Sequence, residues 1–184
     1  MNIKTTKVGE LRTNCYIVSD DNEALVIDPG FETEKILQEV GGLKIKAVIL
    51  THGHYDHVTE AFKLNAPVWI GEKDEAMMKL TTGKKADRLL KDHDSFDICH
   101  LTFVIYETPG HTPGGICLYN EKEKVLFTGD TLFGADYGRT DLPGGSESEM
   151  VNSLKKLLKL PPETKVYPGH GHPTTIGDEQ NLLQ

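Results

Sequence analysis

Short apolar runs and one helical repeat shape the first half of the chain. Segments 15–20 (CYIVSD) and 24–30 (ALVIDPG) are rich in apolar and β-branched residues, the second closed by a Pro-Gly turn, and both predict strands. Segment 33–40 (TEKILQEV) places apolar side chains at helical spacing, and two glycines follow it, which predicts a helix that ends there. The nearly continuous apolar run 46–50 (KAVIL) predicts a buried strand.

The second half carries further strands and one long amphipathic helix. We expect a helix after residue 57 that runs to about Leu64, and a helix with a surface excursion over the charged, weakly patterned segment 72–98. Residues 146–160 predict an amphipathic helix, because a serine cap is followed three positions later by an acidic residue. Strands are expected within segments 67–71 (PVWIG), 101–110 (LTFVIYETPG), 115–120 (GICLYN), 124–130 (KVLFTGD) and 164–171 (TKVYPGHG).

Composition and charge narrow the class of protein. The 184 residues fit one domain over 1–184, with 38% hydrophobic and 26% charged residues. The 20 basic against 28 acidic residues give a net charge of −8, which argues against binding of nucleic acid or an anionic membrane. The first residues resemble no secretory signal, and no apolar run is long enough to cross a membrane. We therefore expect a cytoplasmic protein, with its three widely spaced cysteines buried as small hydrophobes.

Four polar clusters follow predicted strands. They are THGHYDH at 51–57, PGHTPGG around His111, TGDTLF around Asp130 and YPGHGH around His170. Loops that gather at one edge of a sheet are where rigid scaffolds commonly hold reactive groups. The placement of these clusters therefore predicts one shared site.

Imidazole and carboxylate groups in this pattern predict a metal site. An isolated histidine or aspartate would more commonly be a turn or core residue, but four titratable groups within residues 52–57 would repel one another or remain undersolvated without a cation. These ligands suit zinc, iron or manganese. One predicted set is His52, His54, His111 and Asp130; the other is Asp56, His57, His170 and the same Asp130, which would bridge two ions. His93, His100 and His172 lack such company and are expected at the surface or behind the ligands.

The four motifs, in this order and over nearly the whole chain, resemble the metallo-β-lactamase-fold hydrolase superfamily. The resemblance implies a four-layer αββα sandwich in the α/β (α+β) class, with the metals at one edge of its two sheets. It also carries the family's ligand roles to the seven residues of the two sets. Asp28, in VIDPG, matches a position that supports the metal loop, and a simple turn residue is the alternative.

Within that superfamily, segment 134–145 (GADYGRTDLPGG) resembles compact glyoxalase II-like hydrolases and also persulfide dioxygenases. True β-lactamases are similar in fold but usually carry cysteine where this chain has Asp130, which argues against antibiotic hydrolysis. The chain ends at Gln184, before the C-terminal extension with which longer glyoxalase II enzymes hold glutathione, so the thiol carrier is open. The first expectation is hydrolysis of a small-molecule thioester of the hydroxyacyl-glutathione type.

The mechanism expected for such a thioesterase uses a hydroxide that bridges two divalent ions, zinc first, because bound metal lowers the pKa of water to about 7. Asp56 would be catalytic, orienting the hydroxide while coordinating a metal. Tyr137 and Arg139 are expected to contact the substrate, although an ion pair between Arg139 and Asp141 is an equal alternative.

Two other functions fit the same residues. In a mononuclear iron persulfide dioxygenase, the metal would be held by His52, His111 and Asp130. In a non-catalytic metal-binding module the ions would only stabilise the fold, but the open coordination positions left by both ligand sets are typical of catalytic sites. The oligomeric state is not readable from the sequence.

Overall fold

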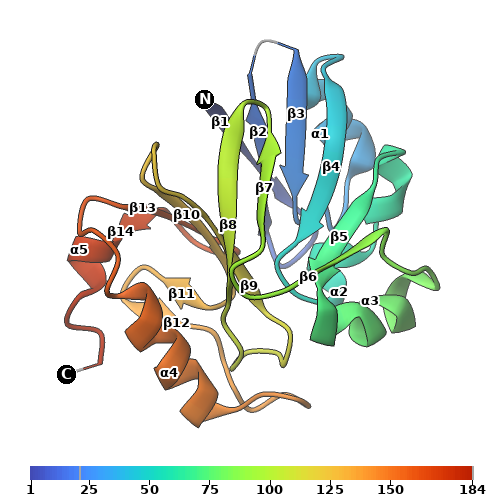
Figure 1. Ribbon diagram of the computed structural model, residues 1–184. Helices are drawn as coiled ribbons and strands as arrows, with labels where there is room; N and C mark the ends of the chain where they lie inside the picture. The colour runs from blue at the N-terminus through green and yellow to red at the C-terminus, as the bar shows by residue number, and fades with distance from the viewer. Residues whose placement is uncertain (21, 184) are drawn as a thin grey trace.

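The computed structural model describes residues 1–20 and 22–183, and two six-stranded β-sheets form its centre (Figure 1). The first sheet has the order β1-β2-β3-β4-β5-β6, antiparallel from β1 to β3 and parallel from β3 to β6. Its strands are, in that order, Asn2–Val8, Thr13–Ser19, Glu23–Ile27, Lys44–Leu50, Val68–Gly71 and Arg88–Leu90.

The second sheet has the order β14-β13-β10-β9-β8-β7, and only β10 and β13 run parallel within it. A small hairpin of β11 (Leu132–Phe133) and β12 (Asp136–Tyr137) follows β10. The strands of the second sheet are, in sheet order, Thr174–Thr175, Lys165–Pro168, Val125–Gly129, Ile116–Asn120, Leu101–Glu107 and Ser95–Ile98.

The helices lie on the outer faces of the two sheets (Figure 1). The first sheet is accompanied by α1 (Thr33–Val40), α2 (Tyr55–Val58), η1 (Ala61–Leu64), η2 (Glu72–Asp74) and α3 (Glu75–Thr82). The second is covered by α4 (Glu147–Leu157) and α5 (Ile176–Glu179). The chain therefore has four layers, helix–sheet–sheet–helix, which confirms the predicted αββα fold.

Alternating side chains divide the interior among these layers. Tyr16 of β2 packs in the cluster between the sheets with Phe103 and Phe127, whereas its neighbour Ile17 packs on the opposite face with Ile36 of α1. Successive side chains of a strand point to opposite faces, so a strand buried on both faces needs apolar residues at consecutive positions. This explains why the central strands appear in the sequence as continuous apolar runs.

Two predictions about elements are wrong in part. The helix expected to reach Leu64 is interrupted, because the backbone N–H of Glu60 donates to the carbonyl of Gly30 instead of continuing the helix. Segment 72–98 contains the expected helix α3, but also the short strands β6 and β7. These strands have three and four residues, too few to display a periodic pattern.

Strand β1 was not anticipated either, because five of its seven residues are polar and most of them are exposed. Across the described ranges, no helix is both long enough and apolar enough to cross a membrane.

Candidate metal centre

The four polar clusters meet at one place. Residues 51–57 follow β4, the last three of them within α2, and His111, Asp130 and His170 follow β8, β10 and β13. The seven predicted ligands form three overlapping groups of three residues, in which His52 belongs to two groups and His57 to two. In each group, one ligand atom per residue lies within 4.8 Å of the others. The groups are His52 with His54 and His111, His52 with His57 and Asp130, and Asp56 with His57 and His170.

On the first side of the cluster, backbone and hydroxyl groups orient the imidazoles. His111 Nδ1 lies 2.7 Å from the carbonyl oxygen of Arg139, to which it donates, so that Nε2 faces the cluster, 2.8 Å from His54 Nδ1. The Thr51 hydroxyl donates to Asp28 and lies 3.1 Å from His52 Nδ1. His52 Nδ1–H is therefore the donor in that contact, which leaves its Nε2 lone pair for a metal.

On the second side, carboxylates surround His57 and His170. Asp28 accepts the backbone N–H of Thr51 at 2.8 Å, and its Oδ2 lies 3.0 Å from His57 Nδ1. His57 Nε2 lies 3.4 Å from Asp56 Oδ2, and His170 Nε2 lies 3.3 Å from the same oxygen. Asp28 itself has a positive φ of 53°, so it is at once a turn residue and a support for the metal loop.

Asp130 stands between the two sides. Its Oδ1 lies 3.5 Å from His57 Nε2, and its Oδ2 lies 3.5 Å from Nε2 of both His111 and His170. A carboxylate this close to imidazoles of both predicted ligand sets, His111 of one and His57 and His170 of the other, is placed to bridge two cations.

The electrostatics of the cluster differ from group to group. Burial and the neighbouring His57 lower the pKa of His52 well below its ordinary value, so His52 is neutral. Burial also lowers the pKa of His57, but the carboxylates of Asp130 and Asp28 outweigh it and hold that pKa well above the ordinary value. For Asp56, burial raises the pKa, but the nearby imidazoles of His170 and His57 and the Thr13 hydroxyl more than reverse this, so Asp56 is ionised.

Buried polar atoms without hydrogen-bond partners are independent support for a metal at this cluster. Within the described residues, no hydrogen-bond partner reaches the buried atoms His52 Nε2, His57 Nε2 and Asp130 Oδ1. Unpartnered buried polar atoms are costly, and a cation would satisfy all three. The cluster is therefore able to bind metal ions.

Two supporting residues were not foreseen from the sequence. Asp74, fully buried at the end of η2, accepts the backbone N–H of Gly53 at 2.8 Å and that of Gly114 at 2.6 Å, and so joins two of the metal loops. The Thr13 hydroxyl donates to Asp56 at 2.7 Å. Asp74 lies in the weakly patterned segment 72–98 and Thr13 follows a polar strand, so neither had a sequence signal.

The two predicted substrate residues are engaged elsewhere. Arg139 lines a cleft of about 460 Å³ in front of the cluster, but its guanidinium forms two 2.7 Å hydrogen bonds with Asp141, the alternative considered above. The Tyr137 hydroxyl donates to Glu147 at 3.0 Å. Their contact with a substrate stays a prediction.

Residues outside the cluster lie as expected. His93, His100 and His172 are exposed and belong to none of the three ligand groups. The three cysteines are free and buried, and burial raises the pKa of Cys117 to about 11.

The fold has two facing sheets with outer helices (Figure 1). Together with the largely buried His/Asp cluster at the strand ends, it defines a metal-binding αββα protein. The family model of the metallo-beta-lactamase superfamily matches residues 8–170. The chain belongs to this superfamily, and the resemblance seen in its motifs is confirmed.

Relatives of similar length have names that differ from one another. The chain is 36% identical to hydroxyacylglutathione hydrolase GloC of Haemophilus influenzae, over 98% of this chain and 95% of the relative. The solved structure of the B3 metallo-beta-lactamase BLEG-1 is 35% identical, with a TM-score of 0.91 and complete coverage of both chains. TTHA1623 in a di-iron-bound form is also 35% identical, with a TM-score of 0.84 over 97% of this chain and 98% of that one.

Proposed function

We propose that this protein is a thioesterase that uses two divalent ions, zinc first, to hydrolyse a small-molecule thioester of the hydroxyacyl-glutathione type. The observation that carries the proposal is Asp130, whose carboxylate lies 3.5 Å from imidazoles of both predicted ligand sets, His111 of one and His57 and His170 of the other. A relative named hydroxyacylglutathione hydrolase, at 36% identity over nearly the full chain, supports the substrate type.

The residues of the chain divide the chemistry among them. When bound, two divalent ions supply a water molecule of lowered pKa, a nucleophile at neutral pH. Asp56 is ionised and held by the Thr13 hydroxyl, so its carboxylate is set to orient that water toward the thioester carbonyl. A thiolate with a pKa of about 8.5 leaves without a general acid, so the chain needs no further acid at the cleft.

The test replaces one ligand and measures metal and activity together. His54→Ala is expected to lower the metal content by at least one ion per chain and thioesterase activity by a factor of about 100 or more, because metal both activates the water and polarises the carbonyl. His93→Ala, which removes an exposed imidazole outside the cluster, is the matched control. A His54→Ala protein that kept its full metal content and activity would refute the proposal.

A mononuclear iron persulfide dioxygenase is the second candidate, and the likeness to an iron-bound structure supports iron as its metal. Elemental analysis of protein purified without added metal, beside an oxygen electrode, separates the two. Oxygen uptake with a persulfide and one iron per chain would favour the dioxygenase. A β-lactam belongs in the same substrate panel because of the likeness to BLEG-1.

A further inference from the structure

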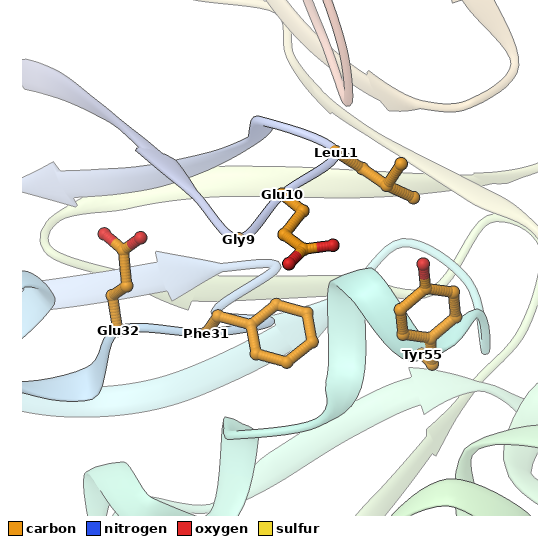
Figure 2. Close-up of a pocket in the computed structure, with 6 residues that line it drawn as sticks. All are labelled: Gly9, Glu10, Leu11, Phe31, Glu32 and Tyr55. Atoms are coloured by element: carbon orange, nitrogen blue, oxygen red, sulfur yellow. The ribbon is translucent and has the colours of Figure 1, made fainter.

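A second pocket opens beside the metal cleft. It has a volume of about 380 Å³, within the range of small-molecule sites. Leu11 and Tyr55 line both the cleft and this pocket, so the two spaces are adjacent. Figure 2 shows the pocket, with Gly9, Glu10 and Leu11 from the turn between β1 and β2 on one side and Phe31 and Tyr55 on the other.

Three of the six residues that line this pocket, Leu11, Phe31 and Tyr55, have large hydrophobic side chains. Leu11 and Tyr55 are each 53% exposed, and they are two of the five large hydrophobic residues that are exposed in the described part of the chain. The Phe31 and Tyr55 rings meet edge-on with centroids 6.3 Å apart. Exposed apolar side chains gathered at one concave place mark binding sites.

The β1–β2 turn is built to approach Phe31. Gly9 has a positive φ of 65°, and a Cβ at that position would lie 2.5 Å from Cδ2 of Phe31. Only glycine lets the turn come this close to Phe31, so a side chain at position 9 would displace the turn or the Phe31 ring and change the shape of the pocket.

Carboxylates set the charge of the pocket. Glu10 and Glu32 line it, and the Glu10 carboxylate extends from the turn toward the Phe31 side in Figure 2. Glu32 is paired with Lys35 at 2.9 Å, whereas Glu10 has no ion-pair partner among the described residues. A ligand group carrying a carboxylate would be repelled here, and an uncharged one would not.

We propose that this pocket, lined by Gly9, Leu11, Phe31 and Tyr55, receives an uncharged apolar arm of the substrate, and that Glu10 disfavours carriers bearing a carboxylate. The proposal rests on the proposed function insofar as the arm belongs to a thioester. Among the thioesters proposed above, it favours those that place an apolar, uncharged group of the acyl or thiol side in this pocket over those that place a carboxylate there.

The first test measures binding without turnover. Three non-hydrolysable thioethers, S-benzyl derivatives of N-acetylcysteamine, cysteamine and thioglycolate, are neutral, cationic and anionic probes. Titrated into the zinc-loaded full chain and followed by NMR, the neutral probe is expected to shift the Gly9 and Phe31 amides and to give contacts to the Leu11 methyls. The anionic probe is expected to bind several-fold more weakly than the neutral one at low ionic strength.

Matched variants separate the pocket from general surface effects. Leu11→Ser is expected to weaken the neutral probe by about tenfold, the order of a lost apolar contact, whereas Leu80→Ser, 89% exposed on α3, is the control. Glu10→Gln is expected to strengthen the anionic probe several-fold, and Glu34→Gln, an exposed acid of α1 outside the pocket, is its control.

Hydrolysis then assigns the arm. To test the acyl side, the thiol is kept constant and neutral, and kcat/KM for the hexanoyl thioester is divided by kcat/KM for the acetyl thioester. To test the thiol side, the acyl group is kept constant, and kcat/KM for the benzyl thioester is divided by kcat/KM for the methyl thioester. Leu11→Ser is expected to lower one of these ratios by about tenfold. Probe contacts outside the pocket, equal binding of neutral and anionic probes, or unchanged ratios would overturn the proposal. Probe binding here without any thioester hydrolysis would refute the proposed function and leave the pocket assignment standing.

Discussion

Four ligand side chains of the cluster are held by a second group, which in three cases comes from a different part of the chain. Asp28 faces His57, the Thr51 hydroxyl meets His52, Thr13 donates to Asp56, and a backbone carbonyl accepts from His111. Such partners fix the tautomer and direction of a ligand, and their loss commonly costs 10–100-fold in metal affinity. The geometry of the cluster therefore depends on these partner groups as well as on the ligands themselves.

Asp74 provides a test at this scale. Asp74→Asn places an amide NH₂ against one of the two N–H groups that Asp74 now accepts, so we expect a loss of about 2 kcal/mol in the free energy of unfolding. We also expect weaker metal binding, because the loops of His54 and His111 lose their common anchor. Urea unfolding and metal titration measure both effects, with the exposed Asp136→Asn as control. If the two variants had the same free energy of unfolding and the same metal affinity, the hydrogen bonds of Asp74 would be unimportant for both.

Helix α4 holds one of the metal loops from outside. Gly110 precedes His111, has a φ of 143°, and lies so close to α4 that an added Cβ would be 2.4 Å from Met150 Cα. The backbone N–H of Ser146, at the start of α4, donates to the Gly110 carbonyl at 2.8 Å. The loop and the helix are therefore positioned as one unit.

Gly110→Ala tests this coupling. The methyl group must displace either α4 or the His111 loop, so we expect a loss of about 1–3 kcal/mol in the free energy of unfolding, the usual cost of overpacking, together with reduced metal content. Gly134→Ala is the control, since a Cβ there meets its nearest atom only at 3.9 Å. Thermal unfolding and elemental analysis of both proteins give the comparison. A Gly110→Ala protein with the stability and metal content of the control would contradict the model of a rigid unit.

At the scale of the whole molecule, the metal cluster joins the two sheets. The ligands within residues 52–57 follow β4 of the first sheet, and His111, Asp130 and His170 follow strands of the second. The hydrophobic cluster between the sheets includes Tyr16, Phe103 and Phe127, and Tyr16 also donates to the carbonyl of Pro168. Bound ions would therefore add a polar connection at the edge of an apolar interface.

Metal removal should consequently lower stability as well as activity. Free metal at 100 times its dissociation constant adds about 2.7 kcal/mol per site to the free energy of unfolding if the unfolded chain does not bind it. We expect the melting temperature of chelated protein to rise as zinc is added back, and to rise less in Asp130→Asn, which lacks the bridging carboxylate. Differential scanning calorimetry measures both proteins. Identical melting temperatures with and without zinc would mean that the cluster does not bind metal in the folded chain.

The sequence by itself determined the strands that are buried on both faces, helix 33–40, and the seven candidate ligands. These features depend on local patterns: continuous apolar runs, helical spacing, and an unusual density of imidazole and carboxylate groups in four motifs. The αββα architecture followed from the order of those motifs and their resemblance to a known superfamily.

Only the tertiary structure decided which groups hold the ligands in place and what surrounds the cleft. Asp74 acts through two hydrogen bonds and Thr13 through one, all to residues at least 21 positions away, and such contacts leave no periodic trace in the chain. The interruption at Glu60, the short strand β6, and the pocket between Leu11 and Phe31 likewise arise where separate segments of the chain meet. Local sequence preferences fix the elements, whereas packing between segments far apart in the chain fixes the directions of the side chains that bind and select.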